Sequence, residues 1–201
     1  MEDIERATDI ILNGGTVIFP TDTVYGLGAN ASDNRAVDRI FEIKHRDKNK
    51  AINVLIADYE DLLKIAEMPT RAEGKLMNKF WPGPLTIILK RKKDIANSAA
   101  ADGDTIGVRM PNNEITRNLI REVGFPLATT SANISGDEPG ISIETIEPEV
   151  IDNVDFVFDD GESDLKIAST IVKIEGDEPI ILREGTIKKA DIESALASDA
   201  D

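Results

Sequence analysis

The chain has 201 residues, of which 23 are Lys or Arg and 38 are Asp or Glu, so its formal net charge at pH 7 is −15. A surface with this excess of carboxylates repels phosphate backbones, which argues against a general nucleic-acid coat and requires any basic site to be local. The sequence contains no cysteine and one histidine, His45. This composition excludes disulfides, thiolate nucleophiles and His-based zinc sites, and leaves only an all-carboxylate Mg²⁺ site open.

The overall composition, with 41% hydrophobic and 30% charged residues, is typical of a globular protein, and the length favours one domain. Residues 1–9 carry acids where a secretory signal would carry bases. The longest apolar stretch, residues 85–89, is far shorter than the roughly 20 residues of a membrane-spanning helix. We therefore expect a cytoplasmic protein that does not cross a membrane.

The predicted elements alternate between helices and strands. Ile4, Ala7 and Ile11 recur at helical spacing and predict a helix over residues 3–13, which Gly14 and Gly15 end. The β-branched and apolar run that follows predicts a strand over residues 16–19, closed by a proline. The same patterns predict a helix that Ser32 or Asp33 caps and that runs to about residue 44, a strand at 52–56, and helices at 59–66 and 71–80.

The second half of the chain continues this alternation. Strands are predicted at 85–89, 106–110, 126–129, 155–158, 170–174 and 180–182, and helices at 114–123 and 189–197. An acidic turn is expected at 159–164 and a frayed polar tail at 198–201. Interleaved strands and helices with short loops favour a single α/β domain, residues 1–201, around a twisted mixed sheet flanked by helices.

A glycine-rich segment at residues 26–31 superficially fits the dinucleotide-binding fingerprint. In that fingerprint the glycines turn directly from a strand into a helix, whereas here Thr21 to Tyr25 intervene after the strand. We therefore reject a nicotinamide-binding site. No Walker phosphate-binding loop occurs either, so an ATP site would need another design.

Two segments allow both a binding and a purely structural interpretation. Residues 20–28, Pro-Thr-Asp-Thr-Val-Tyr-Gly-Leu-Gly, follow a strand where α/β proteins place ligand loops, but their hydroxyls also suit a local turn. The cations Lys44, Arg46, Lys48 and Lys50 either form a solvated face at a helix end or converge on a triphosphate. For a second basic run, residues 90–93, we favour a solvated face.

Arg109 lies within an apolar strand, where an unpaired guanidinium is costly, so we expect it to meet a carboxylate. The ordinary partner is a protein side chain in an internal salt bridge, and the alternative is a ligand. Residues 129–136 collect small hydroxyl and amide side chains that either cradle phosphate oxygens or form loop turns. No activated serine accompanies His45, so a Ser-His-Asp nucleophile is not predicted.

Taken together, the motifs resemble the YrdC-like family, whose characterised members are threonylcarbamoyl-AMP synthases. The resemblance rests on their order along the chain: 20–28 as given above, Lys-x-Arg at 44–46, Phe-Trp-Pro-Gly-Pro-Leu-Thr at 80–86, Val-Arg-Met-Pro at 108–111, Ser-Ala-Asn-x-Ser-Gly at 131–136, Ser-Thr-Ile-Val at 169–172 and Leu-Arg-x-Gly at 182–185. It implies an α/β domain with a concave, positively charged cavity. It also implies a nucleotidyltransferase that makes threonylcarbamoyl-AMP and pyrophosphate from L-threonine, bicarbonate and ATP.

The resemblance further implies roles for individual residues. Thr23, Arg109 and Ser169 would bind threonine, and Lys44 and Arg46 would act in catalysis. The nucleotide site would comprise Lys44, Arg46, Lys50, Thr105, Ser131, Asn133 and Arg183. No protein metal site is implied, because Mg²⁺ would arrive with ATP and take few protein ligands.

The implied partner is a separate transferase that passes the threonylcarbamoyl group to tRNA. A second hypothesis is a double-stranded RNA-binding module that uses the same positive cavity, with direct RNA contact, although the acidic composition disfavours it. A third is a carbamoyl-transfer domain like those within hydrogenase-maturation proteins, which the short chain disfavours.

Overall fold

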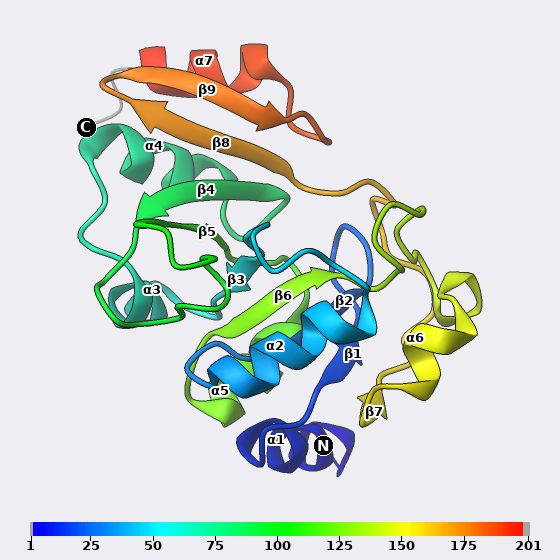
Figure 1. Ribbon diagram of the computed structural model, residues 1–201. Coiled ribbons are helices and arrows are strands. Elements are labelled where there is room, and N and C mark those ends of the chain that lie inside the picture. The colour runs from blue at the N-terminus through cyan, green and yellow to red at the C-terminus, as the bar shows by residue number, and fades with distance from the viewer. Residues whose placement is uncertain (1, 199–201) are drawn as a thin grey trace.

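The computed structural model describes residues 2–198, in which helices and strands alternate along most of the chain (Figure 1). The elements in chain order are α1 (Glu2–Leu12), β1 (Val17–Phe19), β2 (Gly26–Asn30), α2 (Asn34–Ile43), β3 (Asn53–Leu55), α3 (Tyr59–Ile65), α4 (Arg71–Phe80), β4 (Leu85–Lys90), β5 (Thr105–Arg109), α5 (Glu114–Val123), β6 (Leu127–Ser131), the 3₁₀ turn η1 (Ile143–Thr145), α6 (Pro148–Asp152), β7 (Phe156–Val157), β8 (Thr170–Glu175), β9 (Glu178–Arg183) and α7 (Lys189–Ala197).

Across residues 2–198, nine strands form one sheet in the order β7-β1-β2-β6-β3-β5-β4-β8-β9. The pairs β1·β7, β3·β5 and β4·β8 are parallel, and the other neighbours are antiparallel. The prediction of a mixed sheet in an α/β domain is therefore confirmed. This strand order brings the end of β5 and the starts of β4, β6 and β8 to the same end of the sheet, although these residues are far apart in the sequence.

The core lies on both faces of this sheet. In β1, Val17 and Phe19 join a cluster with α1 and α5, whereas Ile18 joins the larger cluster that contains residues of α2, α3 and α4. This alternation follows from the two-residue period of a strand, which sends successive side chains to opposite faces. The helices α1 and α5 pack against each other, as do α4 and α7.

Strand β2 is the main element that the sequence patterns did not predict. Phe19 pairs with Gly26 across the β1·β2 hairpin, and its ring covers both Gly26 and Gly28. A Cβ atom would lie 2.9 Å from this ring at Gly26 and 2.7 Å from it at Gly28. The glycines of the apparent fingerprint therefore make room for an aromatic ring inside the sheet, which agrees with the rejection of a dinucleotide site.

The predicted helices and strands are all present, and their ends differ from the prediction by at most two residues. Asp33, one of the two predicted caps, accepts hydrogen bonds from the amides of Arg35 and Ala36 at the start of α2. The short helix α6 was not predicted. Of the expected frayed tail, residues 199–201 lie outside the described part of the chain, and the amide of Ser198 donates to the Ser194 carbonyl at 3.2 Å. Within residues 2–198, no helix combines the length and hydrophobicity needed to span a membrane.

Candidate functional site

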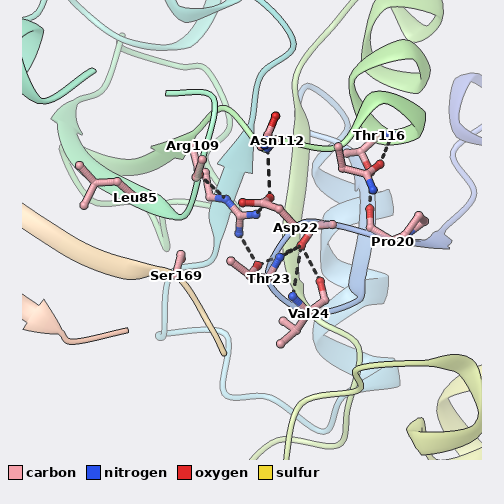
Figure 2. Close-up of polar contacts among 12 residues, drawn as sticks. Pro20, Asp22, Thr23, Val24, Leu85, Arg109, Asn112, Thr116 and Ser169 are labelled. Atoms are coloured by element: carbon pink, nitrogen blue, oxygen red, sulfur yellow. Dashed lines mark hydrogen bonds and ion pairs between the residues drawn. The ribbon is translucent and has the colours of Figure 1, made fainter. Parts of the chain in front are cut away.

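Arg109 ends β5 and is held by three groups from two segments, the loop after β1 and the turn before β4 (Figure 2). Its Nε donates to the carbonyl of Gly83 at 3.2 Å, its Nη1 to the hydroxyl of Thr23 at 2.7 Å, and its Nη2 to a carboxylate oxygen of Asp22. The side chains of Arg109 and Asp22 are 7% and 4% exposed. The internal salt bridge predicted for Arg109 is therefore present. Burial lowers the pKa of Arg109, and the charge of Asp22 opposes this effect.

The loop after β1 forms the hydroxyl turn that was one of its two predicted interpretations. Thr21 donates its hydroxyl proton to the Val24 carbonyl at 2.6 Å and accepts hydrogen bonds from the amides of Thr23 and Val24. The Thr21 and Thr23 hydroxyls also lie within hydrogen-bond distance of each other, at 2.9 Å. The turn thereby fixes the Thr23 hydroxyl beside Arg109.

Ser169 and Arg183 meet where β8 begins and β9 ends. The Arg183 side chain donates from Nε to the Ser169 carbonyl at 3.0 Å and from Nη2 to the Ser169 hydroxyl at 3.1 Å. The close approach depends on Gly185, where a Cβ atom would lie 2.1 Å from the Ala168 carbonyl oxygen. Burial lowers the pKa of Arg183, and the positive charges of Arg109 and Arg46 lower it further.

Lys44, which the resemblance places in the nucleotide site and in catalysis, is not among the residues that line the pocket. It is 1% exposed, and its ammonium group donates to the carbonyls of Ser131 and Asn133 and to the Asn133 amide oxygen. These three bonds use all three N–H groups of a lysine, so none remains for a phosphate. Burial lowers the pKa of Lys44 to about 8, and the charge of Arg46 acts in the same direction.

Asn133 is likewise an internal support rather than a pocket side chain. Its amide nitrogen donates to the carbonyls of Ile134 at 2.8 Å and Asp137 at 2.9 Å, and its oxygen accepts from Ser131 at 2.6 Å as well as from Lys44. The structure therefore does not bring this amide, predicted for the nucleotide site, into the lining of the pocket. Lys44 and Asn133 instead shape the loop that follows β6.

Arg46 and Ser131 do line the pocket. Arg46 is oriented by hydrogen bonds from its Nε to the Lys50 carbonyl at 3.2 Å and from its Nη2 to the Ala51 carbonyl at 2.8 Å. Lys50 itself is exposed and is not among the residues that line the pocket. His45 lies outside it, bonded to Glu149 at 2.8 Å. Of the predicted basic run, one side chain therefore enters the site.

Thr105 is also not brought to the pocket. It begins β5 and is exposed, whereas Arg109 ends the same strand. Four residues of extended strand separate the two positions by about 13 Å. Thr105 pairs instead with Lys90, the last residue of β4.

The pocket has a volume of about 170 Å³. Six of the predicted site residues line it: Thr23, Arg46, Arg109, Ser131, Ser169 and Arg183. Three of these are arginines, and no Asp or Glu is among the lining residues that the structure describes. The main site residue that sequence reasoning missed is Asp22. Its signal was available, because Arg109 was expected to meet a carboxylate and Asp22 is the acid within the loop motif at residues 20–28.

This arrangement defines the class of protein: an α/β protein with a small pocket lined by three arginines and several hydroxyl side chains. The family model for Sua5, YciO and YrdC proteins, which carries the description "Telomere recombination", matches residues 9–185. The chain belongs to this family.

Similar proteins cover most of this chain. A protein of Methanocaldococcus jannaschii, provisionally named a threonylcarbamoyl-AMP synthase, is 45% identical over 177 residues, or 88% of this chain and 83% of its own length. The threonylcarbamoyl-AMP synthase of Pyrococcus abyssi is 38% identical over 194 residues, which is 96% of this chain and 57% of that protein. The crystal structure of P. abyssi Sua5 complexed with L-threonine has a TM-score of 0.92 at 36% identity, with 96% of this chain and 57% of that chain covered. The chain thus spans little more than half the length of the Pyrococcus proteins.

Proposed function

We propose that this protein is a threonylcarbamoyl-AMP synthase, which converts L-threonine, bicarbonate and ATP into threonylcarbamoyl-AMP and pyrophosphate. The observation that carries the proposal is the convergence of Arg46, Arg109 and Arg183 with Thr23, Ser131 and Ser169 on one pocket. The names of the similar proteins, and the threonine in the P. abyssi structure, support the same activity.

Threonine would bind at Thr23, Arg109 and Ser169. A guanidinium carries five N–H groups, and Arg109 uses three of them for protein partners, so two remain for a ligand carboxylate. Asp22 holds the guanidinium in place, which limits the side-chain entropy lost when the amino acid binds. The volume of about 170 Å³ suits an amino acid and lies below the about 300–1,000 Å³ typical of pockets for drug-sized ligands.

The nucleotide would therefore extend over the mouth of the pocket. Arg46 and Arg183 would face its phosphates, and Ser131 would contribute a hydroxyl or a backbone group. Lys44 and Asn133 would act indirectly, since they shape the loop that carries Ser131. Three guanidinium groups without a carboxylate among the lining residues would make this a positively charged cavity.

The chemistry needs orientation and charge stabilisation rather than a covalent enzyme intermediate. The threonine amine adds to bicarbonate with loss of water, and an oxygen of the resulting carbamate attacks the α-phosphorus of ATP. The bond from the α-phosphorus to the bridging oxygen breaks, and pyrophosphate leaves with the electron pair. Holding the reactants as neighbours lowers the barrier, and the arginines stabilise the charge that moves onto pyrophosphate.

Mg²⁺ would enter as a complex with ATP. The donor set of the pocket consists of hydroxyls, amides and guanidiniums, which do not form a carboxylate cage for a divalent cation. The metal would therefore be held mainly by phosphate oxygens, and no protein ligand is assigned to it.

The product is an activated carbamoyl adenylate, so a cytoplasmic transferase that delivers the threonylcarbamoyl group to tRNA adenosine would consume it. Double-stranded RNA binding has no observation in its favour, because a small pocket suits a small molecule better than a phosphate backbone. A carbamoyl-transfer domain of a larger maturation protein is supported by a shared fold alone, since the HypF structure matches 91% of this chain at 24% identity.

The direct test is mass spectrometry of the product. Incubation with ATP, threonine and bicarbonate should give a compound with the mass of threonylcarbamoyl-AMP, and ¹³C-bicarbonate should raise that mass by one unit. Pyrophosphate release should stop when threonine is omitted. Release that continues without threonine would contradict the proposal.

A further inference from the structure

Thr86 is a completely buried residue of β4 whose hydroxyl points to the site without lining it. Within the described part of the chain, its hydroxyl has one hydrogen-bond partner, the hydroxyl of Ser169 at 2.8 Å. The parallel pairing of β4 with β8 sets this contact, because Thr86 pairs with Ile171 and Ser169 directly precedes β8. Ser169 does line the pocket.

The directions of these hydrogen bonds can be assigned by counting protons and lone pairs. A hydroxyl offers one proton and two lone pairs, and a guanidinium only donates, so Arg183 occupies one lone pair of Ser169. If Ser169 donated to Thr86, the Thr86 proton would have no acceptor in a fully buried position, which costs free energy. Thr86 therefore donates to Ser169.

With both lone pairs occupied, Ser169 keeps its proton for the pocket. We propose that Thr86 is a positioning residue that fixes Ser169 as a hydrogen-bond donor toward an acceptor oxygen of the bound amino acid. This inference rests on the proposed function and deepens it, because it assigns Ser169 one hydrogen-bonding direction. A carboxylate, which only accepts, matches that direction.

Two variants at position 86 test the role. Thr86→Val removes the hydroxyl at nearly constant shape, and Thr86→Ser keeps it. We expect Thr86→Val to weaken threonine binding, measured by calorimetry, about 5- to 10-fold and to leave the KM for ATP within twofold, whereas Thr86→Ser restores threonine affinity. The matched control is Thr8→Val, since Thr8 is buried in α1 and its hydroxyl has no hydrogen-bond partner among the described residues. It should not change threonine binding.

A double-variant cycle with Ser169→Ala separates this inference from the proposed function. Thr86→Val should lower the melting temperature of the ligand-free protein by less in the Ser169→Ala background than in the wild type, because the partner hydroxyl is already gone. Equal lowering in both backgrounds would overturn the inference. A second outcome is that the two substitutions are non-additive in melting temperature while neither changes the affinity for threonine. In that case Thr86 does not position a threonine-binding donor, and the assignment of Ser169 to threonine is also wrong. If both substitutions weaken threonine binding but the wild type makes no threonylcarbamoyl-AMP, the proposed synthase activity is wrong and the role of Thr86 stands.

Discussion

Replacing Asp22 with asparagine removes the charge that faces Arg109 and keeps nearly the same side-chain shape. The Asp22 oxygen that bonds Arg109 also accepts the amide of Asn112 at 3.1 Å, and an asparagine oxygen can keep these two contacts. The variant removes the charge of the pair and places an amide NH2 group where the second Asp22 oxygen is buried without a hydrogen-bond partner among the described residues. It leaves a guanidinium that is 7% exposed without its anionic partner.

The expected loss of stability follows from this burial. Breaking a buried ion pair by removing one charge costs about 3–5 kcal/mol. Arg109 lines the pocket and the asparagine can still accept its hydrogen bond, so we expect the low end, about 3 kcal/mol. At about 2–4 °C per kcal/mol for a chain of this size, Asp22→Asn should lower the melting temperature by about 6–12 °C.

Thermal and urea unfolding of four proteins measure this effect: the wild type, Asp22→Asn, Arg109→Met and the double variant. Because an apolar pair of similar volume often replaces a buried ion pair at little cost, the double variant should be more stable than the sum of the single losses predicts. A loss below about 1 kcal/mol in Asp22→Asn, or strict additivity in the cycle, would refute the view that Asp22 compensates the charge of Arg109.

Further predictions concern the loop lysine, the hairpin glycine and the nucleotide arginine. The pKa of Lys44 is about 8 in the folded protein, against its ordinary value of 10.5. Between these two pH values the unfolded chain binds more protons than the folded protein. The free energy of unfolding should therefore increase with pH from about 8 to 10.5. Urea unfolding should show a smaller slope in Lys44→Met, and an unchanged slope would contradict the assigned burial effect. Gly28→Ala should cost about 1–3 kcal/mol through the clash with Phe19, and Phe19→Leu should recover part of it in calorimetry. Arg46→Ala should raise the KM for ATP at least tenfold and the dissociation constant of threonine much less; equal losses would contradict the separate roles.

Local patterns were sufficient for most of the fold because they follow from short-range physics. The helical spacing of Ile4, Ala7 and Ile11 and the cap at Asp33 both act within a few residues. Strand β2 was missed because glycines at 26 and 28 have low strand propensity. That strand forms because β1 and β6 pair with it on either side and Phe19 fills the space above it, which are contacts between distant segments.

The environment of a site residue was predictable where the chemistry of its side chain restricts the partners that it can have. Arg109 required a carboxylate in any fold that buried it, and the structure supplies Asp22. Lys44 carried no such constraint, because a lysine suits a phosphate and a set of carbonyls equally well. Its partners, Ser131 and Asn133, come from a loop far along the chain, so only the tertiary structure shows that its donors are occupied.

The wide separation of Thr23, Arg109 and Ser169 along the chain has a consequence for the lifetime of the protein. A molecule held by all three would join strands from both halves of the sheet, and such a molecule binds only the folded chain. Occupancy at 100 times the dissociation constant would then add about 2.7 kcal/mol to the free energy of unfolding. Proteolysis that proceeds through rare global opening would slow by about a hundredfold, so the abundance of the protein would follow the supply of its proposed substrate.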